Sequence, residues 1–401
     1  MFERLKIGFV NWLIGTEQNY MDNYMPLLTG NKFNTSQALN ISTVYTCINI
    51  LASTMSRLPL EVFQADEIKG KTKDKKDPRY PTLHYNFNDF TTSNTAISYL
   101  ETVRNLKGNS FLKIIRKGQK ISLEIIYNWQ IIGYGVINGQ LYYYIKETED
   151  GEAVPISSMD ILHFKSLVTK DGIWGINPIE ALRMNLSATY KGLKSIDNFY
   201  ENNANTPKAI KSTVAGANQA KMIEALKKFD KDYAGTTNAG KTMVLPPNTE
   251  IQELKLNFLD AQFIETMRFN DEKIAAIYNI PPHRVGISTA SKFNSVEFMT
   301  LDFKINAVAA NARMYRQEFE FKVLTEKERI EGKSIEFNTN AMIELDHKAK
   351  TEGYQKLFQT AAISPNQIAE FENLPKDPNG DFRVYPMNML RTDKTQNNGI
   401  E

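Results

Sequence analysis

The period of the hydrophobic pattern changes twice along the chain, and this restricts the fold more than any other feature. Between residues 110 and 164 apolar residues fall in short β-type runs separated by turns, whereas the flanking segments repeat every three or four residues. Asn138-Gly139 is the strongest hairpin signal among these turns, because a type I′ turn needs positive φ at both central positions. No βαβ alternation or Rossmann glycine fingerprint occurs. The sequence therefore predicts an α+β fold with helices packed on an antiparallel meander.

Helical periodicity flanks the meander on both sides. Before it, we predict a buried helix over 42–57, capped by Ser42 and stopped by Pro59, and a helix over 95–107 closed by Gly108. The charged segment 66–78 between them is predicted to be a solvated loop. After the meander, helices are predicted over 179–203, 259–279, 295–324, 344–360 and, from a capping box at Ser364, 365–373.

The helix predicted over 295–324 is the longest of the set. Its apolar residues step by three and four, which is a heptad seam: Phe298, Leu301, Ile305, Val308, Ala312, Tyr315 and Phe319. Either packing in the chain's own core or packing against another subunit explains such a seam.

Composition excludes several classes of function. The 401 residues give a prior of two to three domains, and 48 basic against 46 acidic residues leave a net charge of +2. This balance argues against tight, static DNA binding, which depends on a basic excess. Cys47 is the single cysteine, and the four histidines are scattered, so we expect no disulfide, metal site or cofactor. No window of eighteen apolar residues occurs, so we expect no membrane-spanning helix.

Two motifs raise the alternative of an enzyme. Residues Gly235 to Thr242, which include Lys241, match the phosphate-binding pattern G-x-x-x-x-G-K-T. Such a loop needs a strand before it and a helix after it, but here the helical pattern precedes the motif and Met243-Val244-Leu245 follows it. A turn is therefore favoured over a nucleotide hydrolase.

The second enzymatic alternative is a metal-dependent nuclease. Glu67-Ile68-Lys69 and Glu253-Leu254-Lys255 are E-x-K triplets, in which carboxylates could hold Mg²⁺ and a lysine could support the attacking water. Neither triplet has a Pro-Asp partner at a suitable distance upstream. We therefore predict surface positions for both and assign no catalytic residue.

The segment 281–293 joins two predicted helices and contains His283, Arg284, Ser288 and Lys292. An ordinary helix connection is the simpler interpretation. Its length of roughly a dozen residues is nevertheless unusual for a connection without secondary structure, and this indicates a functional loop.

Six blocks of sequence, in order along residues 37–345, resemble the portal protein family of tailed bacteriophages, in particular the portals of long-tailed phages. The blocks are ISTVYTCINILASTMSRLPLEVF, GNSFLKIIRKG, DILHFKSLVTKDGIWGINPIEALR, NAGKTMVLPP, LDAQFIETMRFNDEKIAAIYNIPPHRVG and SVEFMTLDF. The match weakens beyond residue 345, and the C-terminal part is short for this family.

The resemblance implies a division of the chain into named parts. A wing would comprise 37–177 and 294–343, a stem 178–203 and 258–280, a clip 204–257, a tunnel loop 281–293, and a helical crown 344–390. An N-terminal arm, 1–36, and a disordered tail, 391–401, would lie outside these parts.

The resemblance also implies a function. Portal proteins would form a ring, usually of twelve copies, at one capsid vertex of the virion, assembled in the cytoplasm of the host bacterium, through which DNA is packaged and ejected. Catalysis would belong to the large terminase. The other expected partners are head-completion or adaptor proteins, the major capsid protein, scaffolding protein and, transiently and without sequence specificity, double-stranded DNA. No membrane partner is expected.

Charge suggests how each part would act. The stem helix would be net acidic, with Asp260, Glu265, Asp271 and Glu272 against Arg268 and Lys273, and would keep DNA centred by repulsion. The clip is net basic, and its candidate partner-binding residues are Lys208, Lys211, Lys227, Lys228, Lys231 and Lys241. In the tunnel loop, His283, Arg284 and Lys292 are predicted to make transient phosphate contacts, with Ser288 also facing DNA.

Overall fold

The computed structural model describes residues 35–66, 70–169, 171–201, 208–212, 223–224, 249–253, 261–287, 299, 301–339, 347–372 and 374–384. The chain divides into two compact units, Met1–Glu336 and Phe337–Glu401. Most of the predicted arm and all of the predicted tail lie outside the described residues. Among the described residues, no helix is long and apolar enough to cross a bilayer.

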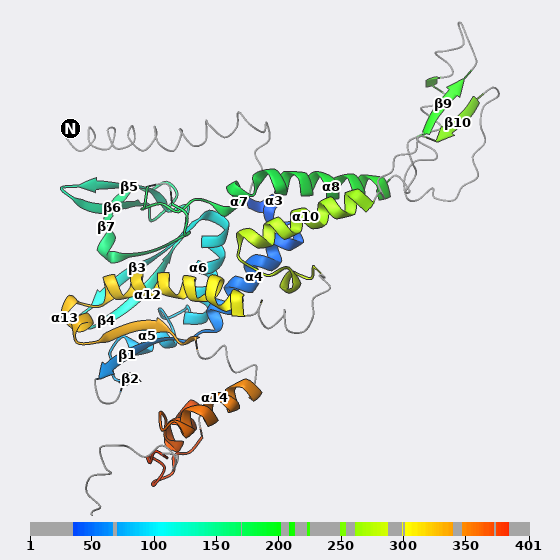
Figure 1. Ribbon diagram of the computed structural model, residues 1–401. Helices are drawn as coiled ribbons and strands as arrows, with labels where there is room; N and C mark the ends of the chain where they lie inside the picture. The colour runs from blue at the N-terminus through cyan, green and yellow to red at the C-terminus, as the bar shows by residue number, and fades with distance from the viewer. Residues whose placement is uncertain are drawn as a thin grey trace, which may run out of the picture. The chain divides into compact units, whose positions relative to one another are not determined.

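Two packed helices, α4 (Ser42–Arg57) and α6 (Ser93–Lys107), lie at the centre of the first unit (Figure 1). A short helix, α3 (Thr35–Leu39), precedes α4. The predicted apolar stripe of α4 is buried, but the predicted cap is wrong: Ser42 is the first helical residue, and the N-cap, Ile41, makes no side-chain bond. Helix α6 starts two residues before its predicted start, because Thr92 caps it by accepting from the Thr95 N–H, and it ends at Gly108, whose φ is 84°.

The predicted meander forms two antiparallel sheets rather than one. The first contains β4 (Lys120–Ile126), β3 (Asn109–Lys117) and β8 (Ile161–Lys165) in that order. The second contains β5 (Ile131–Ile137), β6 (Gln140–Ile145) and β7 (Val154–Ser157). A one-turn helix, η1 (Ser158–Asp160), leads from β7 into β8.

The Asn138-Gly139 turn has the predicted geometry, with φ of 51° and 78°. A shared core joins the two sheets, and its fully or nearly buried members are Phe111, Ile126, Ile131, Tyr143, Ile145 and Ile161.

A third sheet has the order β11-β1-β2, with β1 (Leu60–Asp66), β2 (Gly70–Lys73) and β11 (Lys333–Phe337). The solvated loop predicted over 66–78 is therefore wrong in part. Strand β2 pairs antiparallel with β1, placing Phe63 opposite Lys73, and Asp77 is only 3% exposed. Its neighbours explain this, since Arg79 and Lys333 satisfy a carboxylate that the sequence pattern assigned to solvent.

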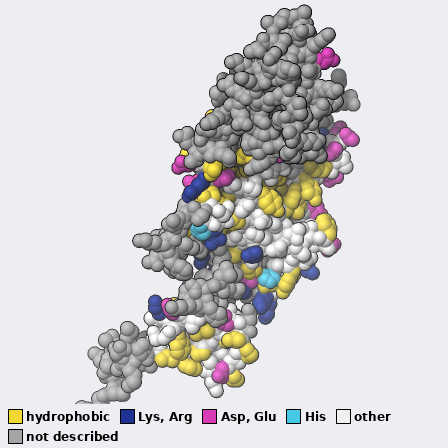
Figure 2. Space-filling view, turned by 90° about the vertical axis from the view of Figure 1, so that its right-hand side faces the viewer, with side chains coloured by type: hydrophobic (Ala, Val, Ile, Leu, Met, Phe, Trp, Pro, Cys, Tyr) yellow, Lys and Arg dark blue, Asp and Glu magenta, His cyan; other side chains and the backbone are white. Residues whose placement is uncertain are grey.

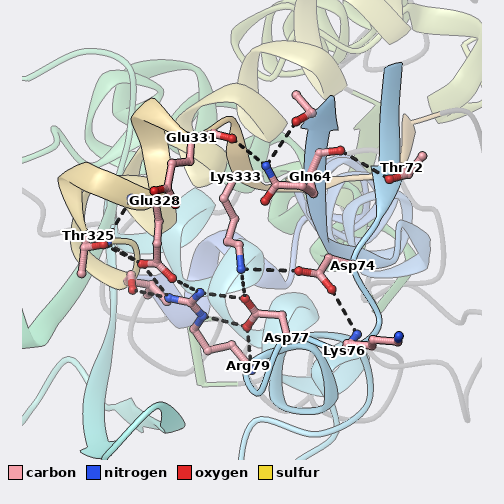
Figure 3. Close-up of polar contacts among 12 residues, drawn as sticks. Gln64, Thr72, Asp74, Lys76, Asp77, Arg79, Thr325, Glu328, Glu331 and Lys333 are labelled. Atoms are coloured by element: carbon pink, nitrogen blue, oxygen red, sulfur yellow. Dashed lines mark hydrogen bonds and ion pairs between the residues drawn. The ribbon is translucent and has the colours of Figure 1, made fainter. Parts of the chain in front are cut away.

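An ion network joins this sheet to the short helix α13, Glu326–Ile330 (Figure 3). Arg79, beside helix α5 (Tyr80–His84), donates to Asp77 at 2.7 Å and also pairs with Glu328 of α13. Lys333 of β11 donates to Asp77 at 2.7 Å and lies 3.4 Å from Asp74. The network thereby joins the segment before α5 to α13, which lies about 250 positions later in the sequence.

The long helix is not α-helical throughout. Residues 301–303 are α-helical, η4 (Lys304–Ala309) is π-helical, and α12 (Ala310–Val323) follows. The predicted heptad seam is therefore divided: Val308, Ala312, Tyr315 and Phe319 are buried, whereas Leu301 and Ile305 are 51% and 55% exposed. A π turn contains one extra residue, so Leu301, which precedes it, and Ile305, near its start, face a different direction from the buried seam residues farther along.

Helices α8 (Arg183–Glu201) and α10 (Ala261–Ile277) pack side by side (Figure 1). The helix predicted over 179–203 is interrupted at Leu182, which ends the short α7 (Pro178–Ala181). Between α8 and α10 in sequence, β9 (Lys208–Ser212) and β10 (Thr249–Glu253) form a two-stranded antiparallel sheet.

The second unit contains α14 (His347–Gln359) and α15 (Pro365–Phe371). The predicted capping box is present, because the Ser364 side chain accepts from the Gln367 N–H and the Gln367 side chain accepts from the Ser364 N–H. The rings of Tyr354 and Phe371 stack at 6.1 Å between centroids and hold the two helices together.

Candidate nucleic-acid interface

Helix α10 has one buried and one exposed face. Asn270, Ile274 and Tyr278, just beyond its end, are buried, whereas Glu265 and Phe269 are exposed. Ile277, the last residue of the helix, is 44% exposed. The exposed face is the part of α10 that can meet a ligand or another subunit.

Polar contacts fix the buried face of α10 against three other helices. The Thr43 hydroxyl of α4 donates to Asp271 at 2.7 Å, and the Asn185 amide of α8 donates to Asn270 at 3.3 Å. The Tyr278 hydroxyl donates to the backbone carbonyl of Asn105 at 3.3 Å. Asp271, one of the four acidic residues predicted to repel DNA, is thus held by α4.

The exposed face of α10 carries charges of both signs. Arg268 lies 3.2 Å from Glu272, one helical turn away, and the Lys273 ammonium lies 5.0 Å from the ring centroid of Phe269. Glu265 lies on the same face as Glu272, two turns apart. Asp260 lies outside the described residues, so among the described side chains this face carries two acids and two bases.

Acidic and basic side chains are also mixed elsewhere on the surface. Figure 2 shows one side of the molecule, on which the described surface carries scattered acidic, basic and hydrophobic side chains. A surface of this kind gives a phosphate backbone no continuous field of one sign.

The described part of segment 281–293 contains a 3₁₀ turn, η3 (Pro282–Val285), a few residues after the end of α10. Gly286 ends the turn with φ of 83°, a left-handed conformation that glycine adopts without strain. The Ile287 N–H donates back to the Pro282 carbonyl at 3.1 Å. Ser288 and Lys292 lie outside the described residues, so the structure brings together only His283 and Arg284 of the predicted tunnel-loop set.

Arg284 lies on an aromatic ring. Its guanidinium carbon is 4.4 Å from the ring centroid of Phe303, which is fully buried immediately before the π-helix η4. Burial lowers the pKa of the Arg284 guanidinium. Its Nε is buried with no hydrogen-bond partner in the described part of the chain.

His283 lies beside this arginine and is also partly buried. Burial, and then the positive charge of Arg284, lower the pKa of the imidazole, so it is neutral at neutral pH. A neutral His283 can offer a hydrogen bond to phosphate but no charge.

In the predicted clip, the register of β9 and β10 places Lys208 opposite Glu253 and Lys211 opposite Glu250. The other four candidate lysines, Lys227, Lys228, Lys231 and Lys241, lie outside the described residues, as does the whole of 235–242.

The structure adds little in favour of the nuclease alternative. Glu253 ends β10, and residues 67–69 of the other triplet lie outside the described residues. Among the residues that the structure describes, no three histidine, cysteine, aspartate or glutamate side chains converge in a way that could hold a metal ion. Cys47 is fully buried, and burial followed by the charge of Asp271 raises the pKa of its thiol to about 12.

Sequence reasoning missed Thr43 and Phe303 as partners of the candidate site. Thr43 and Asp271 are 228 positions apart in the chain, and Arg284 and Phe303 belong to different elements. No local pattern could have indicated either contact.

In chain order, the three-stranded sheets and their helices are followed by α8, then the small β9–β10 sheet, and then α10. A family model described as phage portal protein matches residues 42–373. The chain belongs to the phage portal protein family. Portal proteins are structural components of the virion, and family membership places this chain in a portal ring at a capsid vertex.

Curated relatives support the assignment over nearly the whole chain. The portal protein of Enterobacteria phage HK97 is 21% identical over 383 residues, covering 93% of this chain and 89% of the relative. A probable portal protein of Streptomyces phage phiC31 is 22% identical over 368 residues, covering 88% of this chain and 79% of the relative.

Solved structures confirm the fold. The crystal structure of an HK97-family phage portal protein from Corynebacterium diphtheriae has a TM-score of 0.57 at 12% identity and covers 77% of this chain and 97% of that one. A chain in the virion of a gene transfer agent has a TM-score of 0.53 at 15% identity and covers 85% and 92%. The predicted α+β portal fold is therefore confirmed.

Proposed function

We propose that twelve copies of this portal protein close into the ring through which DNA enters and leaves the capsid. The observation that carries the proposal is the family match over 42–373, which includes both stem helices and segment 281–293. Twelve is supported by a similar chain in the neck of a gene transfer agent particle, computed with C12 symmetry, with a TM-score of 0.51. Each copy would contribute two different faces to a head-to-tail interface that closes by rotation.

The proposed division into parts follows the elements. The three sheets with α4, α6 and α12 would be the wing, α8 and α10 the stem, the β9–β10 sheet part of the clip, and α14 and α15 the crown. The crown would lie inside the head, where the major capsid and scaffolding proteins assemble in the host cytoplasm. The clip would meet the large terminase during packaging and an adaptor protein afterwards, through its lysines.

A conduit must touch DNA without holding it. Each firm contact of lysine or arginine with phosphate releases counterions and adds affinity that must be lost again as the strand moves. The exposed face of α10 suits this requirement, since Arg268 is occupied by Glu272 and Lys273 lies over Phe269. Glu265 and Glu272 would repel phosphate, and Asp260 would add to this repulsion.

Segment 281–293 is proposed to line the narrowest part of the ring, with His283, Arg284, Ser288 and Lys292 toward DNA. Replacing His283, Arg284 and Lys292 together with alanine should reduce DNA packaging in a reconstituted system while rings still assemble. Packaging at the parental rate by this variant would refute the proposal for the segment.

No catalytic activity is proposed for this chain, since the ATP hydrolysis that drives packaging would belong to the terminase. The match at 235–242 makes a phosphate-release assay with Lys241→Ala the direct check on a nucleotide hydrolase. Magnesium-dependent DNA cutting, with Glu67→Gln and Glu253→Gln, checks the nuclease. Hydrolysis or cutting that these substitutions abolish would contradict a purely structural role.

Electron microscopy of the purified protein tests the ring itself. Rings with a central opening and twelve-fold symmetry are expected. A monodisperse compact monomer under solution conditions that support capsid assembly would overturn the proposed function.

A further inference from the structure

The contact between Arg284 and Phe303 joins two parts of the candidate interface. Arg284 belongs to η3, in the first half of segment 281–293, and Phe303 belongs to the long helix. It is the one contact of a charged side chain with an aromatic ring that links these two elements within the described residues.

The environment of the contact makes it strong. Phe303 is fully buried, and Arg284 is half-buried, so the guanidinium has lost part of its water. A cation over an aromatic face gains most when it is desolvated. An arginine that instead served phosphate would have to expose its fork of N–H donors, whereas the Arg284 Nε is buried without a partner in the described part of the chain.

The position of Phe303 is itself determined by an irregular feature. It is the residue immediately before the π-helix Lys304–Ala309, where the helix changes register. Single π turns are uncommon and often occur at functional sites. The side chain that receives Arg284 therefore sits at the place where the long helix departs from regular geometry.

We infer that Arg284 is a positioning residue, which anchors the first half of segment 281–293 to the long helix through Phe303 instead of contacting DNA itself. The inference rests on the proposed function and departs from it at one residue: Arg284 is not among the side chains that meet DNA, and it instead sets the position of residues 281–287, which include His283. Loss of the anchor frees the segment while the body of the protein stays folded.

A thiol-labelling experiment measures the anchor directly. Cys47 is fully buried, so an Ile287→Cys variant carries one accessible thiol, placed three residues after Arg284. Its labelling rate is measured on the purified full-length protein, whatever its oligomeric state. The outcome is thus separate from whether a ring forms, which electron microscopy tests.

Four variants are compared in the Ile287→Cys background. Arg284→Met keeps the packing of an unbranched side chain without the charge, and Phe303→Leu keeps apolar volume without the ring. Each should raise the labelling rate about tenfold, and the double variant should raise it no further, since both remove the same contact. Phe303→Tyr keeps the aromatic face and should label at the parental rate.

A second arginine–aromatic contact provides the matched control. Arg329 lies 5.8 Å from the ring centroid of Phe321, which is 54% exposed, so Arg329→Ala should leave labelling at position 287 unchanged. Unchanged labelling in Arg284→Met would overturn the inference even if the Phe303 variants fail to fold. The inference would also fail if Arg284→Met reduced packaging equally with and without the Phe303→Leu substitution, because a phosphate contact does not depend on the ring.

Discussion

The proposed wing and the proposed stem hold their charges in opposite ways. In the wing, Glu101 is fully buried and accepts hydrogen bonds from Arg104, Asn105, Asn311 and Tyr315. In the proposed stem, Glu265, Arg268, Glu272 and Lys273 lie on the exposed face of α10, where Arg268 pairs with Glu272.

This difference indicates which charged side chains can exchange their partners for water or ions. A buried charge with several partners cannot exchange them for water without a large penalty, so it fixes α6 and α12 in one arrangement. An exposed ion pair is worth little and exchanges freely with solvent and ions. The proposed wing is therefore held in one arrangement by buried charges, whereas the charges on the exposed face of α10, in the proposed stem, exchange partners readily.

Breaking the Glu101 cluster should give the largest effect on stability. Glu101→Gln removes the negative charge and leaves the buried Arg104 cation unpaired, which costs about 3–5 kcal/mol. Urea unfolding of the variant should show the loss as a lower midpoint. A stability within about 1 kcal/mol of the parent, the size of one ordinary hydrogen bond, would contradict a rigid wing.

Breaking the Arg79 network should have the next largest effect. Arg79→Ala removes the bonds to Asp77, Glu328 and the Val323 carbonyl, but Lys333 still neutralises Asp77, so we expect a loss of about 3 kcal/mol. Lys327→Ala, which removes an exposed contact with Glu331 at 3.8 Å on the same α13, is the control and should change little.

The same network should make the stability of the proposed wing sensitive to acid. A hydrogen bond from Arg79 lowers the pKa of Glu328 to about 2 from 4.5, so its contribution is complete above about pH 4.5 and is lost as the pH falls toward 2. Burial raises the pKa of Asp77, but bonds from Arg79 and Lys333 outweigh burial and leave it below its ordinary value, which adds in the same direction.

The free energy of unfolding, measured from pH 6 down to about pH 2, checks this prediction. Glu328→Gln should flatten part of the decline, because a side chain that does not titrate binds no additional proton in the unfolded state. An unchanged slope would mean that the acid sensitivity arises elsewhere in the chain.

The smallest effect is expected on the stem. Arg268→Ala removes an exposed pair with Glu272 and should change stability by about 0.5 kcal/mol or less. Replacing Glu265 and Glu272 together with glutamine should likewise leave the free energy of unfolding almost unchanged. It should nevertheless increase retention of DNA at low salt, because it removes the repulsion between these carboxylates and phosphate. Salt-dependent DNA binding of the purified ring, compared with the parent, measures this effect.

Local patterns predicted the features that depend on neighbouring residues. The Asn138-Gly139 turn, the Gly108 helix end and the Ser364 capping box each need only a few consecutive residues, and all three are present. The resemblance of ordered blocks gave the family, which the match over 42–373 confirms. The proposed tunnel-loop, stem and clip roles remain predictions.

By itself, the sequence determined the α+β class, most helices and strands, and the family. Only the tertiary structure decided that Asp77 is buried, that Asp271 is held by Thr43, that Arg284 lies on Phe303, and that the heptad seam divides at a π turn. The reason is physical: hydrogen bonds along a turn are set by residues a few positions apart. The environment of a charge is instead set by whichever distant side chains the fold brings to it, and periodicity cannot identify those partners.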